Sequence, residues 1–168
     1  MTATWADFRP RALLQLLASR GVDHVVVGGY AAVLHGSPRI TQDLAISYAT
    51  DQANLDALGR ALSDASARLY GIQDDVPFVP DGRTLARAEL LTLQTDLGKL
   101  DLMADPGGGP GYSLLRASAE TVDLGDFAVR IASLEDLLAM KRSAGRPKDR
   151  ADVVELEAIG RLRRDSGS

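Results

Sequence analysis

The sequence predicts a mixed α/β (α+β) domain in which a small, partly antiparallel sheet is flanked by helices and followed by C-terminal helices. Segments with strand-like alternation are interleaved with segments that repeat apolar residues at helical spacing. A turn signal at residues 95–98 joins two of the strands as a hairpin, which makes part of the sheet antiparallel. The chain has no internal repeat, and residues 1–168 are expected to form one domain. Its core spans about residues 22–132, and its helical part spans about 133–164.

Helices are predicted wherever apolar residues recur every three or four positions. The predicted helices span residues 4–20, 30–35, 51–69, 113–119, 134–143 and 149–164. In the first, Leu13, Leu14 and Leu17 form the apolar stripe. Asp51 is a plausible N-cap of the third helix, and Ser133 begins the fifth in an arrangement like a capping box.

Strands are predicted where side-chain character alternates with a period of two. The predicted strands span residues 25–27, 41–48, 88–94, 99–104 and 127–131. Within the second strand, Asp43 and Ala45 share one face, and within the fourth strand Asp101 lies opposite the leucines. Residues 71–83 and 104–112 are rich in glycine, proline and aspartate and are expected to be loops.

Composition excludes several classes of chemistry. The chain has no cysteine, which excludes disulfides, thiolate metal sites and cysteine nucleophiles, and its two histidines argue against a histidine-rich zinc site. A metal here would be held by carboxylates, which favours magnesium or manganese. No apolar run approaches the ~20 residues of a membrane span, and the first residues lack the features of a signal peptide. We therefore expect a cytoplasmic protein that does not enter a membrane.

Charge is distributed unevenly along the chain. The net charge is −4, yet residues 141–164 contain eight Lys and Arg against four acidic residues. A basic C-terminal end on an acidic body is typical of a surface that faces a polyanion. A solvated helix with mixed charges explains the same pattern equally well.

The residues from Val25 to Tyr48 contain the first candidate site. Three valines run directly into Gly28 and Gly29, and a short helix follows. A strand that enters a Gly-Gly turn allows backbone N–H groups to approach a phosphate. Gly-Gly turns are more often turns without a ligand, and this one lacks the further glycines of the known nucleotide-binding fingerprints.

Two strand aspartates and one helical lysine strengthen this candidate. Asp43 and Asp101 lie in separate predicted strands between apolar neighbours, where an unpaired carboxylate is costly. Both could converge on one divalent cation, although each could also be a satisfied structural carboxylate. Lys141 continues the apolar stripe of its helix, so its ammonium either reaches solvent or offsets the charge of a triphosphate.

Three segments together resemble a known family. GGYAAVLHGSPRITQDLA, GKLDLM and ASLEDLLAMKRSAGRPKDRAD occur in this order within about residues 25–155, and they resemble the AbiEii-type nucleotidyltransferases of the polymerase-β-like superfamily. This family includes toxins of bacterial toxin–antitoxin pairs. The resemblance implies metal binding by Asp43 and Asp101, with support from Asp149 or Asp152. It also implies a nucleotide-binding set, comprising Gly28, Gly29, Arg39, Thr41, Lys141, Arg146 and Lys148.

One departure from the family pattern is serious. The pattern has Asp-x-Asp where this chain has Asp43-Leu44-Ala45. Two carboxylates at positions 43 and 45 would project from one strand face and hold two metal ions. Because the surrounding motifs are intact, we interpret Ala45 as a deliberate inactivation rather than as natural loss of the chemistry.

The expected parent activity is metal-dependent transfer of a nucleoside monophosphate from an NTP to an acceptor, with Asp43, Asp101, Lys141 and Asp152 in the catalytic site and Ala45 in the place of a metal ligand. The expected acceptor is tRNA, whose modification would block translation, and a cognate antitoxin protein is a possible partner. Two alternatives remain: a small-molecule nucleotidyltransferase of the aminoglycoside-modifying kind, and a non-catalytic module that binds a nucleotide or a partner. For the chain as it stands, we expect weak or absent turnover.

Overall fold

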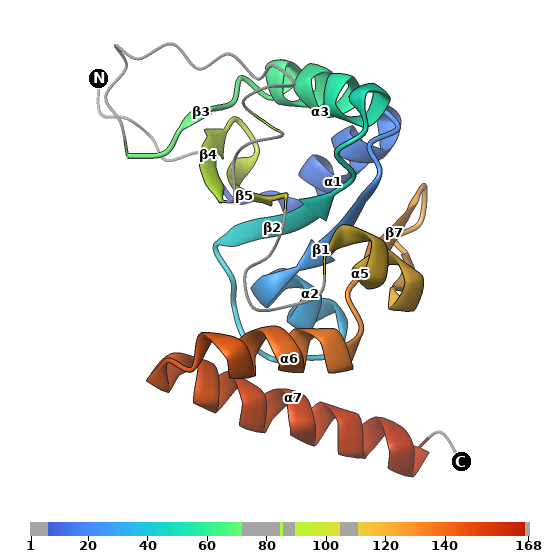
Figure 1. The fold of residues 1–168 in the computed structure, drawn as a ribbon, viewed down its shortest axis with the longest axis vertical. Coiled ribbons are helices and arrows are strands. Elements are labelled where there is room, and N and C mark those ends of the chain that lie inside the picture. The colour runs from blue at the N-terminus through green and yellow to red at the C-terminus, as the bar shows by residue number, and fades with distance from the viewer. Residues whose placement is uncertain (1–6, 72–84, 86–89, 105–110, 167–168) are drawn as a thin grey trace.

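The computed structural model describes residues 7–71, 85, 90–104 and 111–166, and within them seven strands form one mixed sheet (Figure 1). The strand order is β3-β4-β5-β2-β1-β7-β6. The strands are β1 (His24–Val27), β2 (Asp43–Tyr48), β3 (Arg68–Leu69), β4 (Leu91–Thr95), β5 (Gly98–Met103), β6 (Glu120–Asp123) and β7 (Ala128–Ile131). The helices are α1 (Pro10–Ser19), α2 (Gly28–Leu34), α3 (Gln52–Asp64), α5 (Tyr112–Ser118), α6 (Leu134–Ala144) and α7 (Pro147–Ser166).

The centre of the sheet brings distant segments together. Strand β2 pairs antiparallel with β1 and parallel with β5, while β1 also pairs parallel with β7. Three antiparallel pairs, β3 with β4, β4 with β5 and β6 with β7, complete the sheet. The predicted mixed, partly antiparallel sheet with C-terminal helices is confirmed.

The core is formed by leucine stripes of α1 and α3 and by the inward faces of the central strands. Leu13, Leu14 and Leu17 of α1 are each 1% exposed, which confirms the predicted stripe. Helix α3 begins as predicted, because the side chain of Asp51 accepts a hydrogen bond of 3.1 Å from the backbone N–H of Asn54. Burying such stripes supplies most of the free energy that holds these helices on the sheet.

Helices α6 and α7 pack against each other along one end of the molecule, as Figure 1 shows. Ser133 caps α6 by accepting a hydrogen bond of 3.1 Å from the N–H of Asp136. Gly145 ends α6 in the left-handed region, with φ of 66°, and Pro147 opens α7. The predicted break between the two helices is therefore confirmed.

Two predicted helix boundaries were wrong by several residues, and one strand was missed. Among the described residues, the first helix begins only at Pro10, because a residue that precedes proline disfavours the helical region. The helix predicted over 51–69 ends at Asp64; the chain turns at Ser66, with φ of 53°, and residues 68–69 form β3. Strand β6 was missed, because its four residues are short and partly exposed, and only pairing with β7 defines it.

Parts of several predictions lie outside the described residues. These are residues 4–6 of the first helix, 72–83 and 105–110 of the two loops, and 88–89 of the third strand. Within the part of the chain that is described, no helix is both long and apolar enough to span a membrane.

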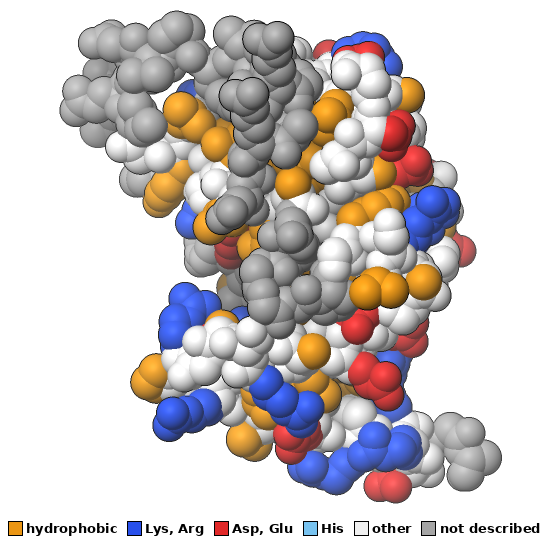
Figure 2. Space-filling view, viewed as in Figure 1, with side chains coloured by type: hydrophobic (Ala, Val, Ile, Leu, Met, Phe, Trp, Pro, Cys, Tyr) orange, Lys and Arg blue, Asp and Glu red, His pale blue; other side chains and the backbone are white. Residues whose placement is uncertain are grey.

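Lys and Arg side chains gather over α6 and α7 (Figure 2). Lys148, Arg150 and Arg161 are exposed there. Others are paired: Arg142 lies 2.8 Å from Glu157, and Arg163 lies 3.2 Å from Glu120. This end of the molecule thus presents a basic but partly neutralised surface.

Candidate functional site

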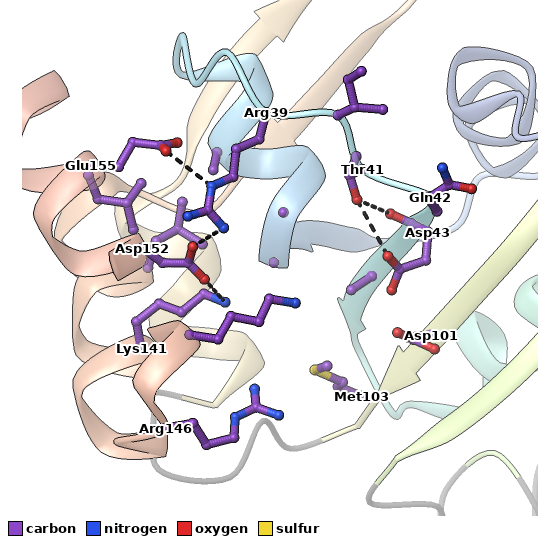
Figure 3. A pocket seen from close by; sticks show the side chains of 18 residues that line it. Arg39, Thr41, Gln42, Asp43, Asp101, Met103, Lys141, Arg146, Asp152 and Glu155 are labelled. Carbon is purple, nitrogen blue, oxygen red and sulfur yellow. Dashed lines mark hydrogen bonds and ion pairs between the residues drawn. The ribbon is translucent and has the colours of Figure 1, made fainter. Parts of the chain in front are cut away.

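A cleft of about 500 Å³ separates β2 and β5 from α6 and α7. Figure 3 shows Asp43 and Asp101 on the sheet side, and on the opposite side the cations Arg39, Lys141 and Arg146 together with the carboxylates Asp152 and Glu155. All twelve residues of the predicted site except Asp149 line this cleft: Gly28, Gly29, Arg39, Thr41, Asp43, Ala45, Asp101, Lys141, Arg146, Lys148 and Asp152. Asp149 lies in the first turn of α7 and is fully buried.

The Gly-Gly turn is packed directly on β2. Gly28 has φ of +70°, and a Cβ at this position would lie 3.3 Å from the Cβ of Ala45. A Cβ on Gly29 would lie 3.2 Å from the Oγ1 of Thr41. Both positions therefore favour glycine, Gly28 through its backbone conformation and both through close approach. The backbone of the turn consequently borders the cleft without any side chain in between.

Asp43 and Asp101 converge on the sheet side of the cleft. In the register of the parallel pair β2–β5, Ala45 lies opposite Asp101 and Asp43 lies opposite Lys99. The pKa of the Asp101 carboxyl is raised to about 6, first by burial and then by the neighbouring Asp43. The Oδ1 atom of Asp101 is buried without a hydrogen-bond partner. Two carboxylates that share a space in this way form a site suited to a divalent cation.

Hard carboxylate oxygens are the ligands that magnesium and manganese prefer, so the two aspartates fit such an ion. The hydroxyl of Thr41 lies 3.4 Å from Asp43 Oδ1 and helps to orient that carboxylate. Ala45 lies beside both aspartates, two residues along β2 from Asp43 and opposite Asp101 on β5, but it offers no oxygen. Among the described residues, no group of three or more His, Cys, Asp or Glu side chains is placed to hold a metal ion.

Lys141 and Arg39 form the cationic side of the cleft, and carboxylates of α7 hold both. The ammonium of Lys141 lies 2.9 Å from Asp152 and 3.5 Å from Asp149. The guanidinium of Arg39 pairs with Asp152 and lies 3.1 Å from Glu155. Asp152 therefore joins the two cations, and its supporting role in the site stays a prediction.

Arg146 belongs to the same network through Asp149. Its Nε donates to Asp149 Oδ2 at 2.7 Å, and its backbone N–H donates to the same atom at 3.1 Å. The hydrogen bond from the Arg146 side chain lowers the pKa of Asp149 to about 2. Asp149 is thus an ionised anchor that positions Arg146 and Lys141.

Glu155 was missed by the sequence reasoning. It accepts hydrogen bonds from both Ser37 and Arg39, and so it ties the segment after α2 to α7. Its spacing of three from Asp152 places both carboxylates on one side of a helix, which was the available signal. Ile40, Gln42 and Met103 also line the cleft and were not predicted.

No protein-family model matches the sequence, and no curated protein matches it either. Solved structures do match the fold. The lincosamide antibiotic adenylyltransferase LnuA, bound to lincomycin, superposes with a TM-score of 0.60 at 17% identity, covering 91% of this chain and 99% of LnuA. ANT(2'')-Ia in complex with adenylyl-2''-tobramycin superposes with a TM-score of 0.53 at 16% identity, covering 92% of each chain.

These similarities establish the class of fold: the chain has the nucleotidyltransferase fold. At 16–17% identity they show the fold alone and do not extend to a particular activity.

Proposed function

We propose that this protein binds a nucleoside triphosphate with a divalent cation in the cleft, and that its parent reaction is nucleotidyl transfer to an acceptor hydroxyl. The observation that carries the proposal is the convergence of Asp43 and Asp101 opposite Lys141 and Arg39. An acidic side suits a metal ion, and a basic side suits the phosphates that the ion also contacts.

In the proposed reaction, the acceptor oxygen bonds to the α-phosphorus, the bond from that phosphorus to the bridging oxygen breaks, and pyrophosphate leaves. The acceptor proton passes to solvent. Asp43 and Asp101 would hold Mg²⁺ or Mn²⁺, which lowers the pKa of the hydroxyl and neutralises phosphate charge when it is bound.

The protein's own groups position the triphosphate. Lys141 and Arg39 are held in place by Asp152, so they need little reordering when phosphate oxygens approach. The backbone of Gly28 and Gly29 borders the same space.

Ala45 weakens the reaction in this proposal. With two carboxylates in place of three, the site lacks the oxygen that a second ion would need. We therefore propose retained nucleotide binding with turnover that is weak or absent. The interpretation of Ala45 as a deliberate inactivation remains a prediction.

The proposed acceptor is tRNA, as in a cytoplasmic toxin with a cognate antitoxin. Exposed cations of α7, among them Lys148 and Arg150, support a polyanionic acceptor. Lys148 also lines the cleft, so this basic surface begins at the proposed nucleotide site.

A second candidate acceptor is a small molecule that carries a hydroxyl group. It is favoured by the fold's similarity to LnuA and ANT(2'')-Ia, whose structures contain an antibiotic or an adenylylated antibiotic. The non-catalytic module is a third outcome, in which the cleft binds a nucleotide or a partner without transfer.

The test compares the unchanged protein with Ala45→Asp and its isosteric control Ala45→Asn. Each is incubated with labelled NTPs, magnesium and either total tRNA or a panel of aminoglycosides and lincosamides. We expect Ala45→Asp alone to label one class of acceptor, and the labelled class identifies the acceptor. If Ala45→Asp labels nothing but still binds NTPs, the non-catalytic module is correct; if it binds no NTP, the proposal is wrong.

A further inference from the structure

An apolar recess of about 240 Å³ opens beside the cleft. Its described walls come from the end of β1, the end of β5, helix α6 and the residue before β4. The apolar lining residues are Val27, Leu90, Met103, Leu137, Met140 and Ala144. Leu90 is 61% exposed and Ala144 is also exposed, so this surface is apolar yet accessible. Accessible apolar surface of this kind is typical of ligand sites.

The recess and the cleft share part of their lining. Gly28, Lys141 and Arg146 line both, together with Met103 and Leu137. Met103 lies on the same face of β5 as Asp101, two residues further along, which is a separation of about 7 Å at the usual strand rise. A ligand with phosphates in the cleft therefore has only a short path from the carboxylates to the recess.

From this continuity we propose that the apolar recess binds the nucleobase of the NTP. The inference rests on the proposed function and adds the place of the base to it. A nucleoside triphosphate has one charged end and one flat, weakly polar end, and the joined spaces offer a charged cleft followed by an apolar recess.

The chemistry of the recess fits an aromatic ring. Two of its six apolar residues are methionines, whose flexible thioethers make favourable contacts with aromatic rings. Met103 and Met140 come from β5 and α6, so they approach a ligand from different walls of the recess. Arg146 at the shared border can stack its guanidinium on the same ring, since Asp149 holds that guanidinium in place.

The recess offers few groups that distinguish one base from another. Among the described residues, its charged lining is Lys141, Arg146 and Asp149, and Asp149 is buried and paired with the other two. Apolar contact discriminates weakly between ligands of similar shape. The four NTPs are therefore expected to bind with affinities that agree within about tenfold.

The experiment compares the binding of ATP and of inorganic tripolyphosphate to the full chain by calorimetry in magnesium. The test variants are Met140→Ala and the exposed Leu90→Ala. The matched control is Leu138→Ala, a partly buried residue of the same helix that lines a different groove. We expect both test variants to bind ATP about three- to tenfold more weakly, with tripolyphosphate binding unchanged. The control should change neither affinity.

Failure of the inference and failure of the proposed function are distinguishable. If the unchanged protein binds ATP no more tightly than tripolyphosphate, or if both test variants bind ATP normally, the recess does not hold the base. If a test variant binds an acceptor more weakly but binds ATP normally, the recess binds the acceptor and the inference is wrong. If the unchanged protein binds neither ATP nor tripolyphosphate, the proposed function is wrong, and so is the inference that rests on it.

Discussion

Replacing Ala45 with aspartate would place a third carboxylate on the sheet side of the cleft. Ala45 is 6% exposed and lies opposite Asp101 in the sheet register. The pKa of Asp101 is already raised to about 6 by burial and by Asp43. A new carboxylate here is desolvated and meets two like charges, so without a cation it destabilises the fold.

The size of the effect follows from burial. An unpaired polar group in such a position costs about 2 kcal/mol. In a domain of this length, that cost lowers the melting temperature by about 4–8 °C. Magnesium at one hundred times its dissociation constant stabilises the folded state by about 2.7 kcal/mol, which offsets the whole loss.

The assay is a thermal melt of Ala45→Asp in a chelator and across a magnesium titration. Ala45→Asn is the control, because it has nearly the same size and no charge. We expect Ala45→Asp to melt below the unchanged protein in the chelator and to recover in magnesium, whereas Ala45→Asn gains no more from magnesium than the unchanged protein does. A destabilised Ala45→Asp that magnesium does not rescue would refute the metal site formed by Asp43 and Asp101.

Three further predictions concern single residues of the site. Asp101→Asn in a chelator should be more stable than the unchanged protein at pH 7 but not below pH 4. The pKa of the Asp101 carboxyl rises from 3.8 to about 6 on folding, so the folded state of the unchanged protein loses stability as pH rises through that window. Urea unfolding at several pH values measures this difference, and equal stability at every pH would contradict it. Lys141→Met should weaken tripolyphosphate binding about tenfold or more, since a charge-assisted contact is lost, and unchanged calorimetric affinity would remove Lys141 from the phosphate site. Gly28→Ala should lower the free energy of unfolding by about 1–2 kcal/mol, because of its positive φ and its contact with Ala45. Gly160→Ala, in the interior of α7 with only ordinary contacts, should instead raise it by about 0.5–1 kcal/mol, and a loss of stability at both glycines would refute the conformational argument.

Local signals in the sequence were sufficient to predict most of the helices and strands. The cap at Asp51, the cap at Ser133 and the break at Gly145 each depend on residues within one helical turn, and all three are confirmed. Strand β6 and the early end of α3 were not predicted, because both depend on strand pairing with residues further along the chain.

The candidate site likewise has features that local patterns predicted and features that depend on tertiary contacts. Alternation in the sequence placed Asp43 and Ala45 on one face, since side-chain direction within a strand has a fixed period. Their position beside Asp101 follows from the parallel pairing of β2 with β5, which no local pattern specifies. The contact of Arg39 with Glu155 joins residues 116 positions apart.

The sequence by itself determined most of the helices and strands, and it named eleven of the residues that line the cleft. Only the tertiary structure decided that Asp43 and Ala45 lie beside Asp101, that α7 carboxylates hold Arg39 and Lys141, and that an apolar recess adjoins the cleft. The physical reason is range: caps, turns and periodicity act between near neighbours in the chain, whereas sheet register and buried ion pairs depend on which distant surfaces pack together.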